Sequence, residues 1–263
     1  MNKTWGVVGC GWLGLELSKS LIEKGHYVHG TTSTPEKINS LEELGISAHL
    51  FKLEDFQKEA EWLKEIDILV LNIPPSSFGD TYALAMAGAA KQVKESCKVV
   101  FVSSTSVYPN HNKEIDENTP TTGTQRNGPY VSSAEIELQE LLEGRLTILR
   151  MSGLVGGNRH PVKFMSGREI KGADQPINLV HRDDCIGIIQ TTVEKNFWGK
   201  TLNVCASQHP SKDKYYIEFA TKYDLDPPVF ISNGGDGKII SNLASIKELG
   251  YNYIYDDPFD FPV

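Results

Sequence analysis

The stretch VVGCGWLG, residues 7–14, decides how the chain folds, because its glycines have the spacing G-x-G-x-x-G between an apolar run and a helical pattern. Gly9 permits a tight turn, Gly11 lets the backbone approach a pyrophosphate, and Gly14 allows a helix to pack closely on a sheet. The N–H groups at the start of the helix would bind the phosphates. The motif predicts a dinucleotide-binding βαβ unit, with Trp12 and Leu13 among the contacts; the alternative is a Gly-rich structural turn.

Strand-like and helix-like segments alternate along the chain from this motif onward. From residue 5 to 150, short apolar runs are separated by helical patterns, which is typical of βαβ units. We predict an α/β fold of the Rossmann type, with a doubly wound, mainly parallel sheet and a small C-terminal substrate lobe. The expected Rossmann core comprises residues 1–155 and 177–205, and the expected substrate lobe comprises residues 156–176 and 206–263.

Some segments depart from the simple alternation. We expect a charged helix that includes Trp62 and Leu63 before the fourth strand, and a helix at residues 211–223. After residue 155 a Gly-, Pro- and base-rich segment interrupts the pattern, and TLNVCA, residues 201–206, restores it. The chain is therefore expected to leave its sheet and re-enter it.

Charge and composition exclude several classes of function. The net charge is -8, with 34 acidic and 26 basic residues, which disfavours a nucleic-acid or anionic-membrane partner because phosphates attract a positive field. The four cysteines form no CxxC pair and no apolar signal segment is found, so we expect a cytoplasmic protein. Without a long apolar run or histidines at i, i+4, we expect no membrane segment and no metal.

The end of the second strand suggests which dinucleotide binds. An acidic residue usually binds the 2′-hydroxyl of NAD at this point, but HGTTST supplies Thr31, Thr32 and Ser33 instead, with Lys37 close by. Hydroxyl groups do not repel a 2′-phosphate, so NADP is expected in preference to NAD. Further cofactor contacts are expected at the end of the fourth strand: Asn72, Ile73 and Pro74.

A cluster of hydroxyl groups ends the fifth strand, in FVSSTSVYP at residues 101–109, and GPY follows at residues 128–130. With LRMSGLVGGNRHP and INLVHRDDCIGII further along, the full chain resembles the extended short-chain dehydrogenases/reductases, the NAD-dependent epimerase/dehydratase family. The resemblance implies catalytic roles for Ser104 and Tyr130. It also implies cofactor contacts from four further residues: Ser103, Ser152, Gly153 and Leu154.

Two features depart from that family. The glycine spacing is G-x-G-x-x-G instead of G-x-x-G-x-x-G, with Val8 in the first place, and Ala134 replaces the lysine of the YxxxK pair. Because a phenol with a pKa of about 10 is only about 0.1% ionised at pH 7, forming the tyrosinate without help costs about 4 kcal/mol. Pro129 suits the first turn of a helix, whose dipole would recover about 0.3–1 kcal/mol for Tyr130.

A neutral phenol still suffices as a proton donor in carbonyl reduction, so the absence of the lysine is expected to slow reduction less than oxidation. The alternative for Tyr130 is a partly buried side chain that orders the start of the helix. The alternative for Ser104 is a residue that binds cofactor or caps the strand.

Basic residues concentrate between positions 159 and 171 of an otherwise acidic chain. In the family that the chain resembles, the corresponding segment lies over the substrate pocket. Arg159, His160 and Arg168 are therefore expected to bind a small, anionic substrate. The alternative is a solvated loop. Cys10 beside a helix N-terminus could have a lowered thiol pKa and act as a redox sensor, although any small residue would fill that place.

Two functions from different classes follow. The first is an NAD(P)-dependent oxidoreductase or epimerase-like enzyme that transfers a hydride to or from a hydroxyl/carbonyl group. The second is a non-catalytic NAD(P)-binding sensor or partner-binding protein, which the loss of the lysine favours. A third, a β-type 3-hydroxyacid dehydrogenase, would need an all-helical domain after residue 145, where this chain has strand patterns. The family resemblance also leads us to expect a homodimer.

Overall fold

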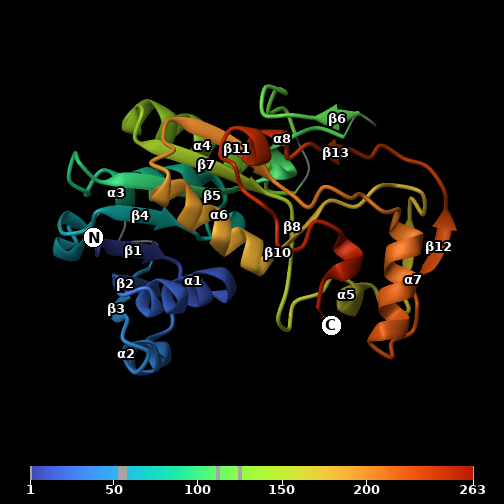
Figure 1. Cartoon of the computed structure of the whole chain (residues 1–263), viewed down its shortest axis with the longest axis horizontal. Helices are drawn as coiled ribbons and strands as arrows, with labels where there is room; N and C mark the ends of the chain where they lie inside the picture. The colour runs from blue at the N-terminus through green and yellow to red at the C-terminus, as the bar shows by residue number, and fades with distance from the viewer. Residues whose placement is uncertain (1, 53–57, 111–112, 124–125, 263) are drawn as a thin grey trace. The chain divides into compact units, whose positions relative to one another are not determined.

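A seven-stranded sheet with the order β11-β7-β5-β4-β1-β2-β3 is the central element of the protein (Figure 1). The structure is a computed structural model that describes residues 2–52, 58–110, 113–123 and 126–262. The strands of the sheet are β1 (Thr4–Val8), β2 (Tyr27–Thr32), β3 (Ser47–Leu50), β4 (Ile68–Leu71), β5 (Lys98–Ser104), β7 (Leu146–Met151) and β11 (Lys200–Val204).

The strand order and direction confirm the predicted Rossmann-type fold. β1 pairs in parallel with both β2 and β4, and the next pairs outward, β2–β3 and β4–β5, are parallel as well. Every residue of β4 and β7 is buried, as expected for strands covered on both faces. The order reverses between β1 and β4, and ligands of such folds bind where the carboxyl ends of the strands meet this reversal.

Helices follow the strands in the predicted alternation. α1 begins directly after the glycine motif and buries Leu13, Leu17 and Leu21, which recur at helical spacing. The expected charged helix before β4 lies partly outside the described residues, and its described part forms the 3-10 helix η3 (Glu61–Lys64). The main helices are α1 (Trp12–Glu23), α2 (Ile38–Glu42), α3 (Tyr82–Ala90), α4 (Gly128–Leu142) and α6 (Arg182–Glu194).

The chain divides into two compact units. The predicted boundaries of core and substrate lobe remain a prediction, because compactness does not identify what a unit binds. One predicted core strand, β10 (Leu179–His181), pairs with β8 (Gly153–Val155) and does not join the seven-stranded sheet. The first unit comprises Met1–Val107, Thr124–Leu149 and Thr192–Thr201, and the second comprises Tyr108–Gly123, Arg150–Thr191 and Leu202–Val263.

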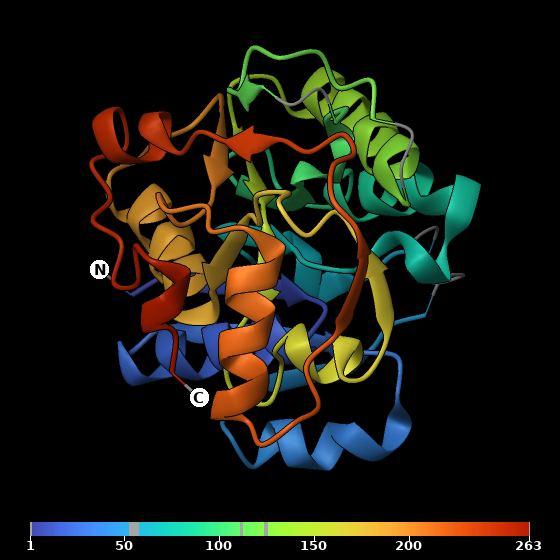
Figure 2. The same cartoon turned by 90° about the vertical axis from the view of Figure 1, so that its right-hand side faces the viewer.

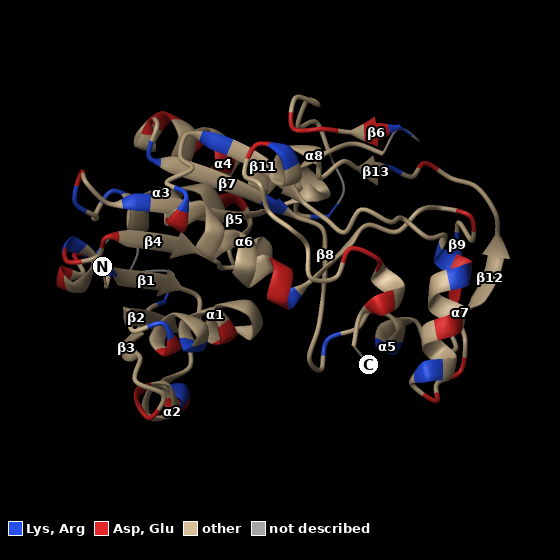
Figure 3. Ribbon diagram, viewed as in Figure 1, with Lys and Arg blue, Asp and Glu red and all other residues tan. Residues whose placement is uncertain are grey.

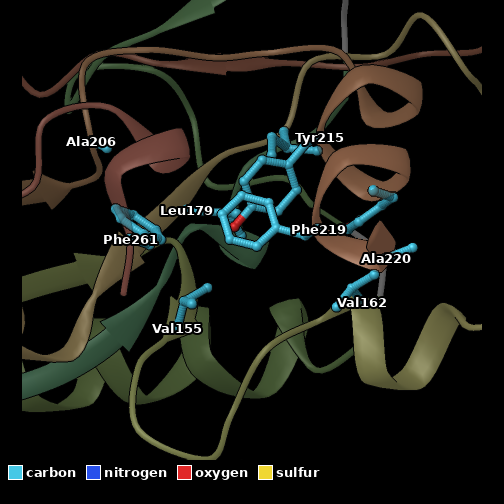
Figure 4. Close-up of a cluster of buried hydrophobic side chains, with 10 residues drawn as sticks. Val155, Val162, Leu179, Ala206, Tyr215, Phe219, Ala220 and Phe261 are labelled. Carbon is cyan, nitrogen blue, oxygen red and sulfur yellow. The ribbon is translucent and has the colours of Figure 1, made fainter. Parts of the chain in front are cut away.

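The second unit combines short strand pairs with a helix that presents aromatic side chains to its core. Figure 2 shows this helix, α7 (Lys212–Lys222), in orange facing the viewer, and Figure 3 shows charges of both signs along it. Its inner face packs Tyr215 and Phe219 against Leu179 and Phe261 (Figure 4). The remaining elements are β6 (Glu114–Ile115), β9 (Glu169–Lys171), β12 (Val229–Ser232), β13 (Ile239–Ile240), α5 (Val162–Met165) and α8 (Leu243–Lys247).

Candidate functional site

The glycine motif forms the turn between β1 and α1, and two of its glycines are required by the protein's own packing. Gly9 has a φ of 106°, and a Cβ there would lie 2.5 Å from the carbonyl oxygen of Asn72. A Cβ on Gly14 would lie 2.1 Å from the carbonyl oxygen of Gly9. These positions therefore need glycine for conformation and close approach whether or not a ligand binds.

Gly11 differs from the other two glycines in the space beside it. Among the described residues, no atom other than those of its chain neighbours and of the helix backbone would lie within 4 Å of a Cβ on Gly11, and its φ of -87° is open to other residues. Gly11 is the N-cap of α1, where the first turn has no side-chain cap and no acidic residue. The N–H groups of that turn are therefore oriented toward an open, positive helix end that suits a pyrophosphate.

Hydrogen bonds from the neighbouring strands hold this turn in place. Gly9 N donates to Thr31 Oγ1 over 2.9 Å, Cys10 N donates to the Thr31 carbonyl over 2.8 Å, and Asn72 Nδ2 donates to the Gly9 carbonyl over 3.2 Å. β2 and β4 thus fix the loop from both sides of β1. The expected contacts at the ends of these strands therefore surround the point where the strand order reverses.

Thr31 has a different role from the one expected. It is only 2% exposed, and its hydroxyl oxygen accepts the hydrogen bond from Gly9, so it shapes the loop and does not face a 2′-phosphate. Thr32 is half-buried and its Oγ1 accepts from Thr34 N, whereas Ser33 and Lys37 are exposed. Only the later part of the expected specificity segment is therefore open to a ligand.

Cys10 does not have the properties of a redox sensor. Burial raises the pKa of its thiol, although hydrogen bonds to Ser18 and Thr31 act in the opposite direction. Its Sγ donates to the Val7 carbonyl at 3.7 Å, and a Cβ added at Gly30 would lie 2.6 Å from the same sulfur. Since the thiolate is the reactive form, the structure makes Cys10 a packing residue and corrects the expectation of a lowered pKa.

A hydrogen bond from α3 holds the chain at the end of β4. Tyr82 Oη donates to the Ile73 carbonyl over 2.8 Å, which ties this edge to α3. Ile73 is half-buried and Pro74 is exposed. Both remain predicted cofactor contacts at the carboxyl end of a strand next to β1.

Ser103 and Ser104 end β5 but make different hydrogen bonds. Ser103 is buried and donates to Glu135 Oε1 in α4 over 2.5 Å. Ser104 is half-buried, and its Oγ accepts from Ser106 N over 3.1 Å. The sequence did not lead us to Glu135, although a charged residue on the apolar face of a predicted helix was a signal that could have revealed it.

Tyr130 lies in the first turn of α4, where Pro129 occupies one of the first two positions as predicted. The tyrosine is half-buried. Ala134, one turn further along, is completely buried, so a methyl group fills the place of the expected lysine. Tyr130 and Ser104 belong to the same compact unit, on adjacent elements α4 and β5.

The expected contacts after β7 belong to the second unit. Ser152 N donates to the Val204 carbonyl, and Gly153 N donates to the Asn178 carbonyl. Ser152 is buried, Gly153 is exposed and Leu154 is half-buried. Their contact with a cofactor remains a prediction from the family resemblance.

The basic segment separates into exposed and buried members. Arg159 and Arg168 are exposed, but His160 is completely buried, which contradicts its expected position toward a substrate. Val162 N donates to His160 Nδ1 over 3.2 Å, so the proton is on Nε2, which lies 2.8 Å from Tyr215 Oη. The ring also stacks on Phe219, with centroids 4.5 Å apart.

Burial determines the charge of His160. It lowers the pKa of the imidazole to about 4, and Lys163 and Lys222 act in the same direction. A neutral imidazole adds no positive charge for an anionic substrate. His160 is therefore a core residue of the second unit, and only the two arginines remain as candidates.

The residues at the start of helix α6 make hydrogen bonds within the second unit. Asp183 N donates to His181 Nδ1 over 3.3 Å. The Asp184 carboxylate accepts from Ile254 N and Tyr255 N, and from the hydroxyl of Tyr251. Asp184 therefore anchors the C-terminal segment of the second unit.

The described residues contain no group of three or more His, Cys, Asp or Glu side chains able to hold a metal ion. In the same part of the chain, every helix is too short or too polar to cross a membrane.

The glycine turn at the reversal of a parallel sheet defines the chain as a Rossmann-type protein with a dinucleotide-binding loop. Residues 4–159 match the family described as the NAD binding domain of 6-phosphogluconate dehydrogenase, and the chain belongs to this family. The β-strands after residue 145 show that the all-helical continuation expected of a β-type 3-hydroxyacid dehydrogenase is not present in the described residues.

Several proteins resemble the chain over nearly its whole length. Protein YeeZ of Escherichia coli K12 is 32% identical over 275 residues, which cover 99% of each chain. A Methylobacillus flagellatus protein, provisionally described as an NAD-dependent epimerase/dehydratase, has a TM-score of 0.78 at 23% identity and covers 98% of this chain and 95% of its own. The human epimerase family protein SDR39U1, solved with NADPH, has a TM-score of 0.74 at 18% identity, with 97% and 96% covered.

Proposed function

We propose that the protein is an NADP-preferring oxidoreductase or epimerase-like enzyme that transfers a hydride between the cofactor and a hydroxyl/carbonyl group of a small, anionic substrate. The observation that carries the proposal is the open space beside Gly11 at the uncapped N-terminus of α1. An anion that approaches this helix end can accept hydrogen bonds from N–H groups of the first turn, which carries the positive end of the helix dipole. The NADPH complex of the human structural relative supports the same cofactor class.

The preference for NADP depends on the exposed residues after β2. Ser33 can donate a hydrogen bond to a 2′-phosphate, and the exposed Lys37 can add charge in the turn that follows. The test variant is Lys37→Gln. Its matched control is Lys24→Gln, which removes one positive charge from an exposed lysine before the start of β2. The first should lower affinity for NADP more than for NAD, and the second should change neither.

Ser104 and Tyr130 are the proposed catalytic residues. Both hydroxyls can donate to a carbonyl oxygen, which develops negative charge as hydride arrives at the carbon. Reduction is the direction that this pair supports best, because it starts from the neutral phenol, which is the form present at pH 7. The phenol proton passes to the alkoxide oxygen, and the tyrosinate left behind takes a proton from water. The cofactor would supply the hydride when bound, and Arg159 and Arg168 remain candidates for the anionic part of the substrate.

A second function, an NAD(P)-binding protein without turnover, is supported by the buried methyl group of Ala134 in place of the lysine. A screen of small carbonyl acids with NADPH separates the two. Turnover that is lost in Tyr130→Phe supports the enzyme. Cofactor binding with no turnover by any substrate, or turnover unaffected by that substitution, contradicts the proposed catalytic role.

A further inference from the structure

The buried face of α4 contains a carboxyl group among apolar side chains. Val131, Ala134 and Leu138 are buried there, and Glu135 is only 2% exposed. An apolar residue would fill this position without removing polar oxygen atoms from water. What makes a carboxyl group tolerable in such a place is the set of hydrogen bonds that it accepts.

The Glu135 carboxyl reaches across to the end of β5. Ser103, which is 5% exposed, donates its hydroxyl proton to Glu135 Oε1 over 2.5 Å. The serine hydroxyl is the donor of this hydrogen bond and the carboxyl oxygen is the acceptor. The bond therefore links helix α4 to strand β5 inside the first unit.

The two linked elements are those that carry the candidate catalytic hydroxyls. Tyr130 lies in the first turn of α4, and Ser104 is the last residue of β5, next to Ser103. Ser104 Oγ accepts from Ser106 N, and no protein acceptor within the described residues takes its hydroxyl proton. A shift of α4 along β5 would change the distance between the two hydroxyls, and misplacement by about 1 Å can cost about 100-fold in rate.

We propose that Glu135 is a positioning residue, which binds Ser103 and so holds α4 against β5 in the register that directs Ser104 and Tyr130 toward the nicotinamide end of the cofactor. The proposal rests on the dinucleotide binding proposed above. In that arrangement the glycine turn and the end of β2 bind the adenine side of the cofactor. The end of β5 binds the other side, so the two sides can be probed separately.

The test compares the dissociation constants of NADPH and of 2′,5′-ADP, which contains only the adenine side, by calorimetry. Glu135→Leu and Ser103→Ala each remove one partner of the hydrogen bond that holds α4 on β5, and each should weaken NADPH by about tenfold. Neither should change binding of 2′,5′-ADP. Ser103→Thr keeps the hydroxyl and should retain wild-type affinity, and Glu140→Gln, at an exposed position of the same helix, is the matched control.

The double variant Ser103→Ala/Glu135→Leu should lose no more NADPH affinity than either single variant, because Glu135 acts through Ser103. A purely structural role would lower thermal stability and weaken both ligands together, which would overturn the proposal, as would unchanged NADPH affinity in Glu135→Leu. If the wild-type protein binds NADPH and 2′,5′-ADP but the variants do not show the expected affinities, only the role of Glu135 is refuted. If the wild type binds neither these nor NADH, the proposed function fails and this inference fails with it.

Discussion

Substitution of Gly11 should separate ligand binding from folding, because no described residue beyond its chain neighbours and the helix backbone would lie within 4 Å of a Cβ at this position. The negative φ of Gly11 accepts alanine. Gly11→Ala should therefore leave the free energy of unfolding unchanged or raise it by about 0.4–1 kcal/mol, since alanine restricts the unfolded chain. The added methyl should nevertheless obstruct the pyrophosphate and weaken NADPH by about 10- to 100-fold, as for the loss of one charge-assisted hydrogen bond.

Gly14→Ala is the matched substitution with the opposite expectation. Its Cβ would lie 2.1 Å from the Gly9 carbonyl oxygen, so the turn has to move, at a cost of about 1–3 kcal/mol of stability. Both variants are measured by urea unfolding and by calorimetric titration with NADPH. Wild-type affinity in a folded Gly11→Ala variant would refute the assignment of the pyrophosphate to this turn.

Three further results are expected. Urea unfolding from pH 7 to pH 4 should show a loss of about 3 kcal/mol in the free energy of unfolding that is attributable to His160. The pKa of His160 is about 6.5 in the unfolded chain and about 4 in the fold, so the stability present above pH 6.5 is lost as the pH decreases. An equal loss in His160→Phe would contradict this. Tyr130→Phe should lower any carbonyl reduction by about 100-fold or more while NADPH still binds, and steady-state kinetics with unchanged kcat would refute it. Ala134→Lys should destabilise the protein by several kcal/mol in thermal unfolding, about the cost of a buried charge, because the site is completely buried; a stable variant would contradict the packing.

Local patterns in the sequence were sufficient to predict the fold. The glycine spacing and the alternation of strands and helices depend on neighbours in the chain, and both appear in the structure as β1, α1 and the strands that follow. The position of Pro129 in the first turn of α4 was likewise predictable from local helix geometry. These features are determined within a few residues of the chain.

Features that depend on distant partners were not predictable in the same way. His160 lies in a basic, Gly- and Pro-rich segment, but its burial is caused by Tyr215 and Phe219 from α7, more than fifty residues further along. The hydroxyl of Thr31 accepts a hydrogen bond from Gly9 N and so does not face the ligand. The Ser103–Glu135 bond also joins two elements that only the tertiary fold brings together.

The central claim is that the turn between β1 and α1 binds the pyrophosphate of a nicotinamide dinucleotide. The most direct measurement is a calorimetric titration of the wild-type protein with NADPH and NADH at neutral pH. One bound dinucleotide per chain, with NADPH bound more tightly, is the predicted result. Saturating concentrations of both cofactors that produce no binding heat, and no rise in melting temperature, would contradict the claim.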